Sequence, residues 1–146
     1  MKFQIVKTDN KARAGLITLN NNVVETPTFM PVATRGAIKS TPHEYLDRTS
    51  ILLANAYHLH LRPGAEIINE HGGLHKFMGW NKLILTDSGG FQAWSLPTKI
   101  YDDGVEFKNV YDGSYFKLTP QESIRTQNLL GSDIAMIFDC LISVEK

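Results

Sequence analysis

The opening stretch of the chain alternates between apolar and polar positions in short runs that polar segments separate. Residues 3–7 and 15–19 carry this pattern on either side of the polar segment 8–11. Three asparagines at 20–22 mark a second turn. Alternation with a period of two, interrupted by Asn-rich turns, is typical of β-hairpins. The pattern predicts a small antiparallel β-meander over residues 1–27.

From Thr28 onward the pattern changes, because short apolar runs now alternate with stretches of helical spacing. This alternation is typical of βαβ units built around a parallel sheet. Residues 105–118 interrupt it with two alternating segments around Asp112-Gly113, a hairpin signal, so we interpret them as an insertion. The sequence predicts an α/β fold. The expected parallel strands are residues 28–32, 51–54, 82–86 and 134–138.

Prolines mark the helix starts of this second part. A Thr-Pro pair followed by glutamate occurs at 41–44 and again at 119–122, and it fits a capping box with proline at the first helical position. Another helix is expected from Pro63 to the glycine pair 72–73. In the helix after residue 119, the apolar residues expected to be buried are Ile124, Leu129 and Leu130.

The composition is that of a folded globular chain. Of 146 residues, 42% are hydrophobic and 21% are charged, with 15 Lys plus Arg against 15 Asp plus Glu. These values exclude an intrinsically disordered chain and a polycationic nucleic-acid tail. With no repeat or linker, residues 1–146 are expected to form one unit. No apolar run reaches membrane-spanning length and the N-terminus does not resemble a signal peptide, so we expect a cytoplasmic protein without membrane contact.

Metal-site signals are weak along the chain. Cys140 is the single cysteine, so it forms no internal disulfide and supplies no thiolate zinc site by itself. His58 with His60, and His71 with His75, lie at close spacing, but no Cys, Asp or Glu completes a recognisable ligand set. The sequence predicts no metal and no other cofactor bound by this chain.

Two aspartates follow predicted parallel strands, Asp87 after residues 82–86 and Asp139 after residues 134–138. Because ligands bind beyond the carboxyl ends of such strands, both carboxylates are expected at one rim, near Asn55. Each aspartate, taken alone, fits a helix or turn cap equally well. As a pair on one rim, the two favour a functional site.

Between these aspartates lies the unusual string Ser88-Gly89-Gly90-Phe91. Paired glycines allow close approach of the backbone and expose N–H groups, which suits a planar ligand or an oxyanion, and Phe91 offers a stacking face. The same string fits a tight strand-to-helix turn with a core phenylalanine, and composition alone favours that simpler interpretation. Scattered cations such as Arg35, Lys39 and Arg62 fit phosphate contacts or ordinary solvated surface.

Four blocks of sequence, in the same order and spacing, resemble one enzyme family. Residues 84–92, ILTDSGGFQ, closely resemble the signature of the tRNA-guanine transglycosylases, also called queuine tRNA-ribosyltransferases. Residues 25–32 (ETPTFMPV), 55–64 (NAYHLHLRPG) and 131–139 (GSDIAMIFD) resemble further blocks of that family. The chain is thereby identified as the N-terminal portion of such a protein.

The resemblance implies a fold and a reaction. The fold is a TIM-type (β/α)8 barrel preceded by a small antiparallel sheet, and because a complete barrel needs about 250 residues, residues 28–146 supply only its first βα units. The reaction exchanges guanine at the tRNA wobble position for a 7-deazaguanine, queuine or its precursor, in queuosine biosynthesis. An aspartate nucleophile attacks the ribose while one base replaces another, so tRNA and the base are the expected partners.

Site residues carry over motif by motif. Asp87 matches the acid/base residue, Ser88, Gly89 and Gly90 match the lining of the base pocket, and Phe91 matches the ring that stacks on the base. Asp139 matches the carboxylate that accepts hydrogen bonds from the base edge, where the N1–H and amino groups of guanine are adjacent donors. The family also forms dimers, and its zinc site lies in the C-terminal part that residues 1–146 do not include.

The chain departs from the family after Asp139. The family has Glu then Cys there, whereas here Cys140 follows directly, and residues 141–146 resemble no family block. We interpret this tail as the result of a frameshift or truncation. Because the segment with the nucleophilic aspartate is not among residues 1–146, we expect this chain to be inactive alone. Two alternatives stay open, a non-catalytic relic or partner subunit that binds another protein, and a hydrolytic glycosidase suggested by the carboxylate pair.

Overall fold

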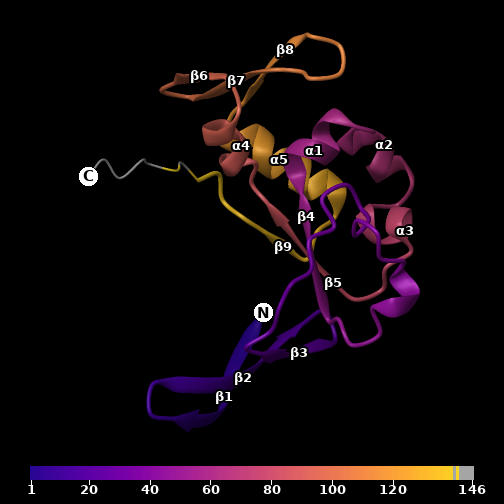
Figure 1. The fold of residues 1–146 in the computed structure, drawn as a ribbon, viewed down its shortest axis with the longest axis vertical. Helices are drawn as coiled ribbons and strands as arrows, with labels where there is room; N and C mark the ends of the chain where they lie inside the picture. Colours follow the sequence, from indigo (N-terminus) through magenta and orange to yellow (C-terminus); the bar gives the residue numbers. More distant parts are fainter. Residues whose placement is uncertain (140, 142–146) are drawn as a thin grey trace.

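The computed structural model describes residues 1–139 and residue 141 (Figure 1). Cys140 and residues 142–146, which include most of the divergent tail, lie outside the described residues. Three sheets follow one another along the chain, an antiparallel sheet, a parallel sheet with its helices, and a second antiparallel sheet. In Figure 1 the two antiparallel sheets lie at opposite ends, with the parallel sheet between them.

The N-terminal sheet is the predicted meander. Its strands are β1 (Lys2–Asp9), β2 (Ala12–Leu19) and β3 (Asn22–Thr26), paired antiparallel in that order. The turns place Asn10, Asn20 and Asn21 at positive φ, a conformation that asparagine tolerates better than most residues. Strand β1 is exposed along its whole length, whereas Val24 of β3 is buried against the parallel sheet.

The parallel sheet carries the candidate site. It consists of β4 (Ile51–Asn55), β5 (Leu83–Asp87) and β9 (Ile134–Ala135), in the order β4-β5-β9. Strands β4 and β5 confirm the prediction. Strand β9 is shorter than the predicted 134–138, and the side chain of Gln127 bonds the main chain of Met136 at the point where the strand ends.

The predicted strand at residues 28–32 is wrong in its extent. Only an isolated parallel bridge between Val32 and Leu53 forms, supported by Leu53 N donating to the Pro31 carbonyl. Pro27 and Pro31 explain the difference, because proline has no N–H to donate to a ladder.

The helices that cover the parallel sheet are short. The helix predicted to begin after Thr41 is a single 3₁₀ turn, η1 (His43–Tyr45), with Pro42 as an extended N-cap and no side-chain cap bond. The helix predicted from Pro63 begins two residues later, after Gly64, and the helix before it was not predicted. The three helices of this region are α1 (Ala56–Leu61), α2 (Ala65–Glu70) and α3 (Leu74–Met78).

Two further helices flank the site. Helix α4 (Gly90–Ser95) begins at the glycine pair, and α5 (Pro120–Leu130) begins as predicted, with Thr119 Oγ1 accepting from Glu122 N at 3.1 Å. The buried side of α5 differs from the prediction. Leu130 is buried and Leu129 packs partly buried against the core, as predicted, but Ile124 is 36% exposed. The other buried residues of the helix are polar, namely Ser123, Thr126 and Gln127.

The insertion is a three-stranded sheet rather than the two-stranded hairpin predicted. It contains β6 (Thr98–Tyr101), β7 (Gly104–Lys108) and β8 (Tyr115–Leu118). The β7–β8 hairpin is confirmed, whereas β6 was missed. The rings of Phe107 and Phe116 stack at 5.3 Å and contact Tyr57 of α1, which fixes this sheet above the site.

The main core lies between the parallel sheet and its helices. Fully buried apolar side chains from both layers meet there, among them Leu52, Ile84, Leu59, Ile68, Leu74 and Leu130. The fold is therefore a mixed α/β arrangement with a small antiparallel sheet and a parallel sheet, and its described residues form no closed barrel. Within that same part of the chain, no helix has the length and apolar character needed to cross a membrane.

Candidate active site

Asp87 and Asn55 end two neighbouring strands. They are register partners at the carboxyl ends of β5 and β4, which brings their side chains together at the rim where parallel sheets bind ligands. Asn55 Nδ2 donates to Asp87 Oδ2 at 2.7 Å. The backbone N–H groups of Ala56 and Gly89 donate to the other oxygen at 3.2 and 3.3 Å. Three donors therefore fix the orientation of this carboxyl group.

The environment of Asp87 favours its neutral form in spite of these donors. Burial raises the pKa of the carboxyl from its ordinary 3.8 to about 6, against the hydrogen bonds from Ala56, Gly89 and Asn55, and the negative charge of Asp139 adds to the rise. A carboxyl group with a pKa near 6 exchanges a proton readily close to neutral pH, which is the property that a general acid or base needs.

Asp139 and the Ser88–Gly90 turn are in contact. Ser88 Oγ donates to Asp139 Oδ1 at 2.5 Å and accepts from Gly90 N at 3.1 Å. A side chain at position 90 has no room, because a Cβ there collides with both the carboxylate and the carbonyl of Asp139. Gly89 has φ +85, a left-handed conformation that glycine adopts freely. The two glycines thus have separate reasons to be glycine.

Asn55 is itself fixed by two further contacts. Its Oδ1 accepts from His58 N at 3.0 Å and caps helix α1, and its Nδ2 also lies 3.2 Å from Gln92 Oε1. Asn55 is 6% exposed, so these contacts determine which end of its amide faces Asp87. The amide end that faces the carboxylate is the donor.

Phe91 lies on the outer side of the turn. Its side chain is 56% exposed and its ring centre is 5.8 Å from that of Trp94. A cavity of about 100 Å³ lies nearby, and the described residues that line it do not include Phe91. The lining includes Gly90, Trp94 and Asp139. Phe91 and Trp94 form an exposed aromatic pair, and of the two only Trp94 lines this cavity.

A second cavity beside the strand ends is cationic. It has a volume of about 520 Å³, and Arg35, Lys39, His58 and Tyr111 are among its lining residues. Arg35 Nη1 donates to the Tyr111 hydroxyl at 3.2 Å, and the guanidinium of Arg62 lies over the Tyr111 ring at 5.2 Å. Burial, together with the charge of Arg35, lowers the pKa of His58, so its imidazole is favoured in the neutral form.

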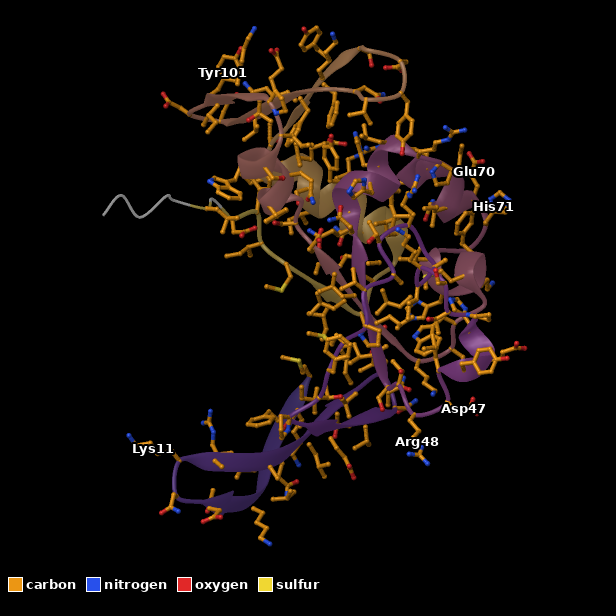
Figure 2. The ribbon with its side chains drawn as sticks, viewed as in Figure 1. Lys11, Asp47, Arg48, Glu70, His71 and Tyr101 are labelled. Atoms are coloured by element: carbon orange, nitrogen blue, oxygen red, sulfur yellow. The ribbon has the colours of Figure 1, made fainter. Side chains whose placement is uncertain are left out.

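The histidine pairs are separated by the fold. His71 is exposed at the outer edge of the molecule beside Glu70 (Figure 2). His75 is engaged elsewhere, since its Nε2 lies 2.9 Å from Asp133 Oδ2. His60 Nδ1 lies 3.2 Å from Thr126 Oγ1. Across residues 1–139 and 141, no three His, Cys, Asp or Glu side chains gather into a possible metal site.

Comparison with known proteins identifies the family. The family model described as Queuine tRNA-ribosyltransferase matches residues 8–146. The chain belongs to the queuine tRNA-ribosyltransferase family. Relatives that carry this name include proteins from Methylobacillus flagellatus, 54% identical over 95% of this chain, and from Buchnera aphidicola subsp. Schizaphis graminum, 51% identical over 100% of it. The protein of that name from Thermotoga neapolitana is 54% identical over 95% of this chain.

The match covers only part of each relative. This chain spans 39% of the Methylobacillus flagellatus protein, 41% of the Buchnera aphidicola protein and 38% of the Thermotoga neapolitana protein. The identification of this chain as a partial member of the queuine tRNA-ribosyltransferase family is thereby confirmed. The roles of single residues stay predictions.

The structure adds residues that the sequence did not single out. Gln92 contacts Asn55, and Ser123 of α5 donates to the Ser88 carbonyl at 2.8 Å. Gln127 contacts Thr86, Ser123 and Met136. A signal for the α5 residues exists, since positions 123, 126 and 127 have the spacing of one helix face, but apolar residues at 124 and 129 indicated a different face.

Proposed function

We propose that this chain supplies the base-binding and proton-transfer half of a tRNA-guanine transglycosylase site. The observation that carries the proposal is the contact that joins Asp139 to the turn following Asp87, through Ser88. The rim therefore holds the Asp87 carboxyl group, which exchanges a proton, beside the Asp139 carboxylate, which accepts hydrogen bonds. A guanine leaving group needs both, because its ring nitrogen takes up a proton and its N1–H and amino groups need acceptors.

Each predicted residue has a role in this proposal. Asp87 is the acid/base residue, Ser88, Gly89 and Gly90 line the base pocket, and Asp139 accepts hydrogen bonds from the base edge. Phe91 stacks on the base, and the exposure of its ring supports this role, since a core phenylalanine offers no face to a ligand.

The substrate class is tRNA, with guanine or a 7-deazaguanine as the exchanged base. The cationic cavity next to the strand ends supports a polyanionic substrate, because Arg35 and Lys39 line it and the RNA backbone is anionic. In the proposed fold of the whole protein, β4, β5 and β9 are strands of a TIM-type barrel to which other strands are added.

Base binding by this chain tests the proposal. Isothermal titration with guanine is expected to give saturable binding that Asp139→Ala abolishes. Asp112→Ala is the matched control, because Asp112 is an exposed aspartate in the β7–β8 loop that bonds only Ser114 among the described residues. Absence of binding to both guanine and a 7-deazaguanine contradicts the proposal, as does equal binding by the Asp139→Ala variant.

A further inference from the structure

Gln127 is a buried polar residue at the centre of the molecule with no assigned role. It lies on α5, is 1% exposed, and its amide group is fully hydrogen-bonded. Oε1 accepts from Thr86 Oγ1 at 2.8 Å and from Met136 N at 2.9 Å. Nε2 donates to the Met136 carbonyl at 2.8 Å and lies 3.3 Å from Ser123 Oγ. One side chain therefore connects α5 to strand β5 and to the residue that follows β9.

The contact with Met136 fixes the backbone three residues before Asp139. The Gln127 side chain bonds both the N–H and the carbonyl of Met136, and this N–H is shared with the Thr86 carbonyl of β5 at 3.2 Å. Strand β9 ends one residue earlier, and the chain continues from Met136 toward Asp139 without further ladder pairing. The position of Met136 therefore sets the starting point of the three residues that lead to the Asp139 carboxylate.

The contact with Ser123 reaches the turn against which Asp139 lies. Ser123 Oγ donates to the Ser88 carbonyl at 2.8 Å, and Ser88 Oγ donates in turn to Asp139. The hydrogen bonds and the intervening backbone form a closed circuit, from Gln127 through Met136 to Asp139, then to Ser88, Ser123 and back. The Gln127 amide is therefore linked to both sides of the contact between Asp139 and the Ser88–Gly90 turn.

A leucine or methionine at position 127 fills the same space, so burial alone does not account for glutamine. Burying an amide without its full set of partners is unfavourable, whereas a satisfied one fixes a single geometry. We propose that Gln127 is a positioning residue that sets the separation between the Ser88–Gly90 turn and Asp139, and hence the fit of the pocket to a purine base. This inference rests on the proposed base-binding function.

Base affinity and amide exchange together test it. Gln127→Met keeps the length of the side chain but removes its donor and its carbonyl acceptor. We expect guanine affinity to fall about tenfold to hundredfold, the range for leaving one buried polar group unpaired. We also expect faster hydrogen exchange at the Met136 and Gly90 amides, with unchanged protection in β4. Gln121→Met is the matched control, because Gln121 is exposed on the same helix.

A conservative variant separates positioning from simple packing. In Gln127→Glu the neutral carboxyl retains one donor and one acceptor, whereas the ionised form has acceptors only. Relative to wild type at each pH, guanine affinity of this variant is expected to recover at pH 5.5 and to fall about tenfold at pH 8. Loss of packing alone predicts no such dependence on pH.

The outcomes distinguish this inference from the proposed function. If wild type binds guanine and Gln127→Met binds it with equal affinity, the role of Gln127 is overturned and the proposed function stands. If wild type binds no base, the proposed function fails, and amide exchange decides the positioning role. Unchanged exchange at Met136 and Gly90 in Gln127→Met then overturns it, and faster exchange confined to those amides supports it.

Discussion

The carboxyl group of Asp87 shows two opposing effects at the scale of one residue. Hydrogen bonds from Asn55, Ala56 and Gly89 stabilise its charge, while burial and the nearby Asp139 oppose it. Burial is the larger effect, and the pKa of about 6 is the result. Full satisfaction by donors fixes the direction of the group without making it a permanent anion, which suits a residue that both gives and takes a proton.

The raised pKa makes stability depend on pH. Since the folded-state value of about 6 lies above the ordinary 3.8, the contribution of Asp87 to stability is fully present below pH 3.8 and is lost as pH rises through 6. Relative to Asp87→Asn, wild type is expected to lose about 2 to 3 kcal/mol of unfolding free energy between pH 4 and pH 7.5. Urea unfolding of both proteins at the two pH values measures this difference. Parallel pH dependences for wild type and variant contradict it.

Substitution of Gly90 tests the close contact between this residue and Asp139. In Gly90→Ala the added methyl collides with the Asp139 carboxylate, so Asp139 must move away from Ser88. We expect a loss of about 1 to 3 kcal/mol in unfolding free energy, as for other overpacked sites, together with loss of guanine binding.

Gly113→Ala is the control for Gly90→Ala. Gly113 also has a positive φ, +75, but a Cβ added there meets only the far part of the Lys108 side chain and collides with nothing. Only backbone strain of about 1 kcal/mol is therefore expected in Gly113→Ala. Unimpaired guanine binding in Gly90→Ala, under conditions where wild type binds, contradicts the geometry described for Asp139.

At the scale of elements, the two Thr-Pro capping strings had different outcomes. Thr119 caps α5, whereas Thr41 precedes a single 3₁₀ turn whose N-cap is Pro42 and whose end no side chain caps. Thr119→Ala is therefore expected to cost about 1 kcal/mol of unfolding free energy, and Thr41→Ala less than about 0.5 kcal/mol. Thermal or urea unfolding of the two variants measures these two losses of unfolding free energy. Equal costs show that the cap at Thr119 is not the cause.

The same contrast shows what the sequence could predict. Strands β4 and β5 and the start of α5 follow from local signals, an apolar run or a cap. The strand predicted at 28–32 does not form because Pro27 and Pro31 remove ladder donors. The strand predicted at 134–138 stops at Ala135, where Gln127 competes with the Thr86 carbonyl for the Met136 N–H. Competition of this kind is decided by contacts between distant segments, and a local pattern does not record it.

The candidate site divides in a similar way. Asp87, Ser88, Gly90 and Asp139 were found because strand ends and glycine pairs are visible along the chain, and the structure brings them together. Their supporting residues were not found. Ser123 and Gln127 lie on a helix whose apolar residues indicated another buried face, and only the three-dimensional fold shows that the buried face is polar.

In the molecule as a whole, apolar side chains are exposed near both edges of the parallel sheet. Phe29 is 80% exposed and Val32 51% beside β4, and Ile137 is 78% exposed just after β9. Open sheet edges with apolar neighbours are prone to pair with other chains. We expect this chain to self-associate at micromolar concentration and to bind an apolar dye.

Single lysine substitutions test the source of that association. Ile137→Lys is expected to shift the chain toward the monomer in size-exclusion chromatography with light scattering. Val110→Lys serves as control, because Val110 is 67% exposed but lies in the β7–β8 loop, away from the parallel sheet. A monodisperse wild-type monomer without dye binding contradicts the expectation, and an equal effect of both substitutions places the contact elsewhere.

Base exchange by a chimera tests the role of Asp87 most directly. Residues 1–139 of this chain replace the matching segment of the Methylobacillus flagellatus relative, and incorporation of labelled guanine into tRNA is measured. The chimera is expected to be active, Asp87→Asn to lower its rate about 10²- to 10⁴-fold, and Asp112→Asn to leave it unchanged. A folded chimera that exchanges guanine equally fast with Asp87→Asn contradicts the role assigned to Asp87.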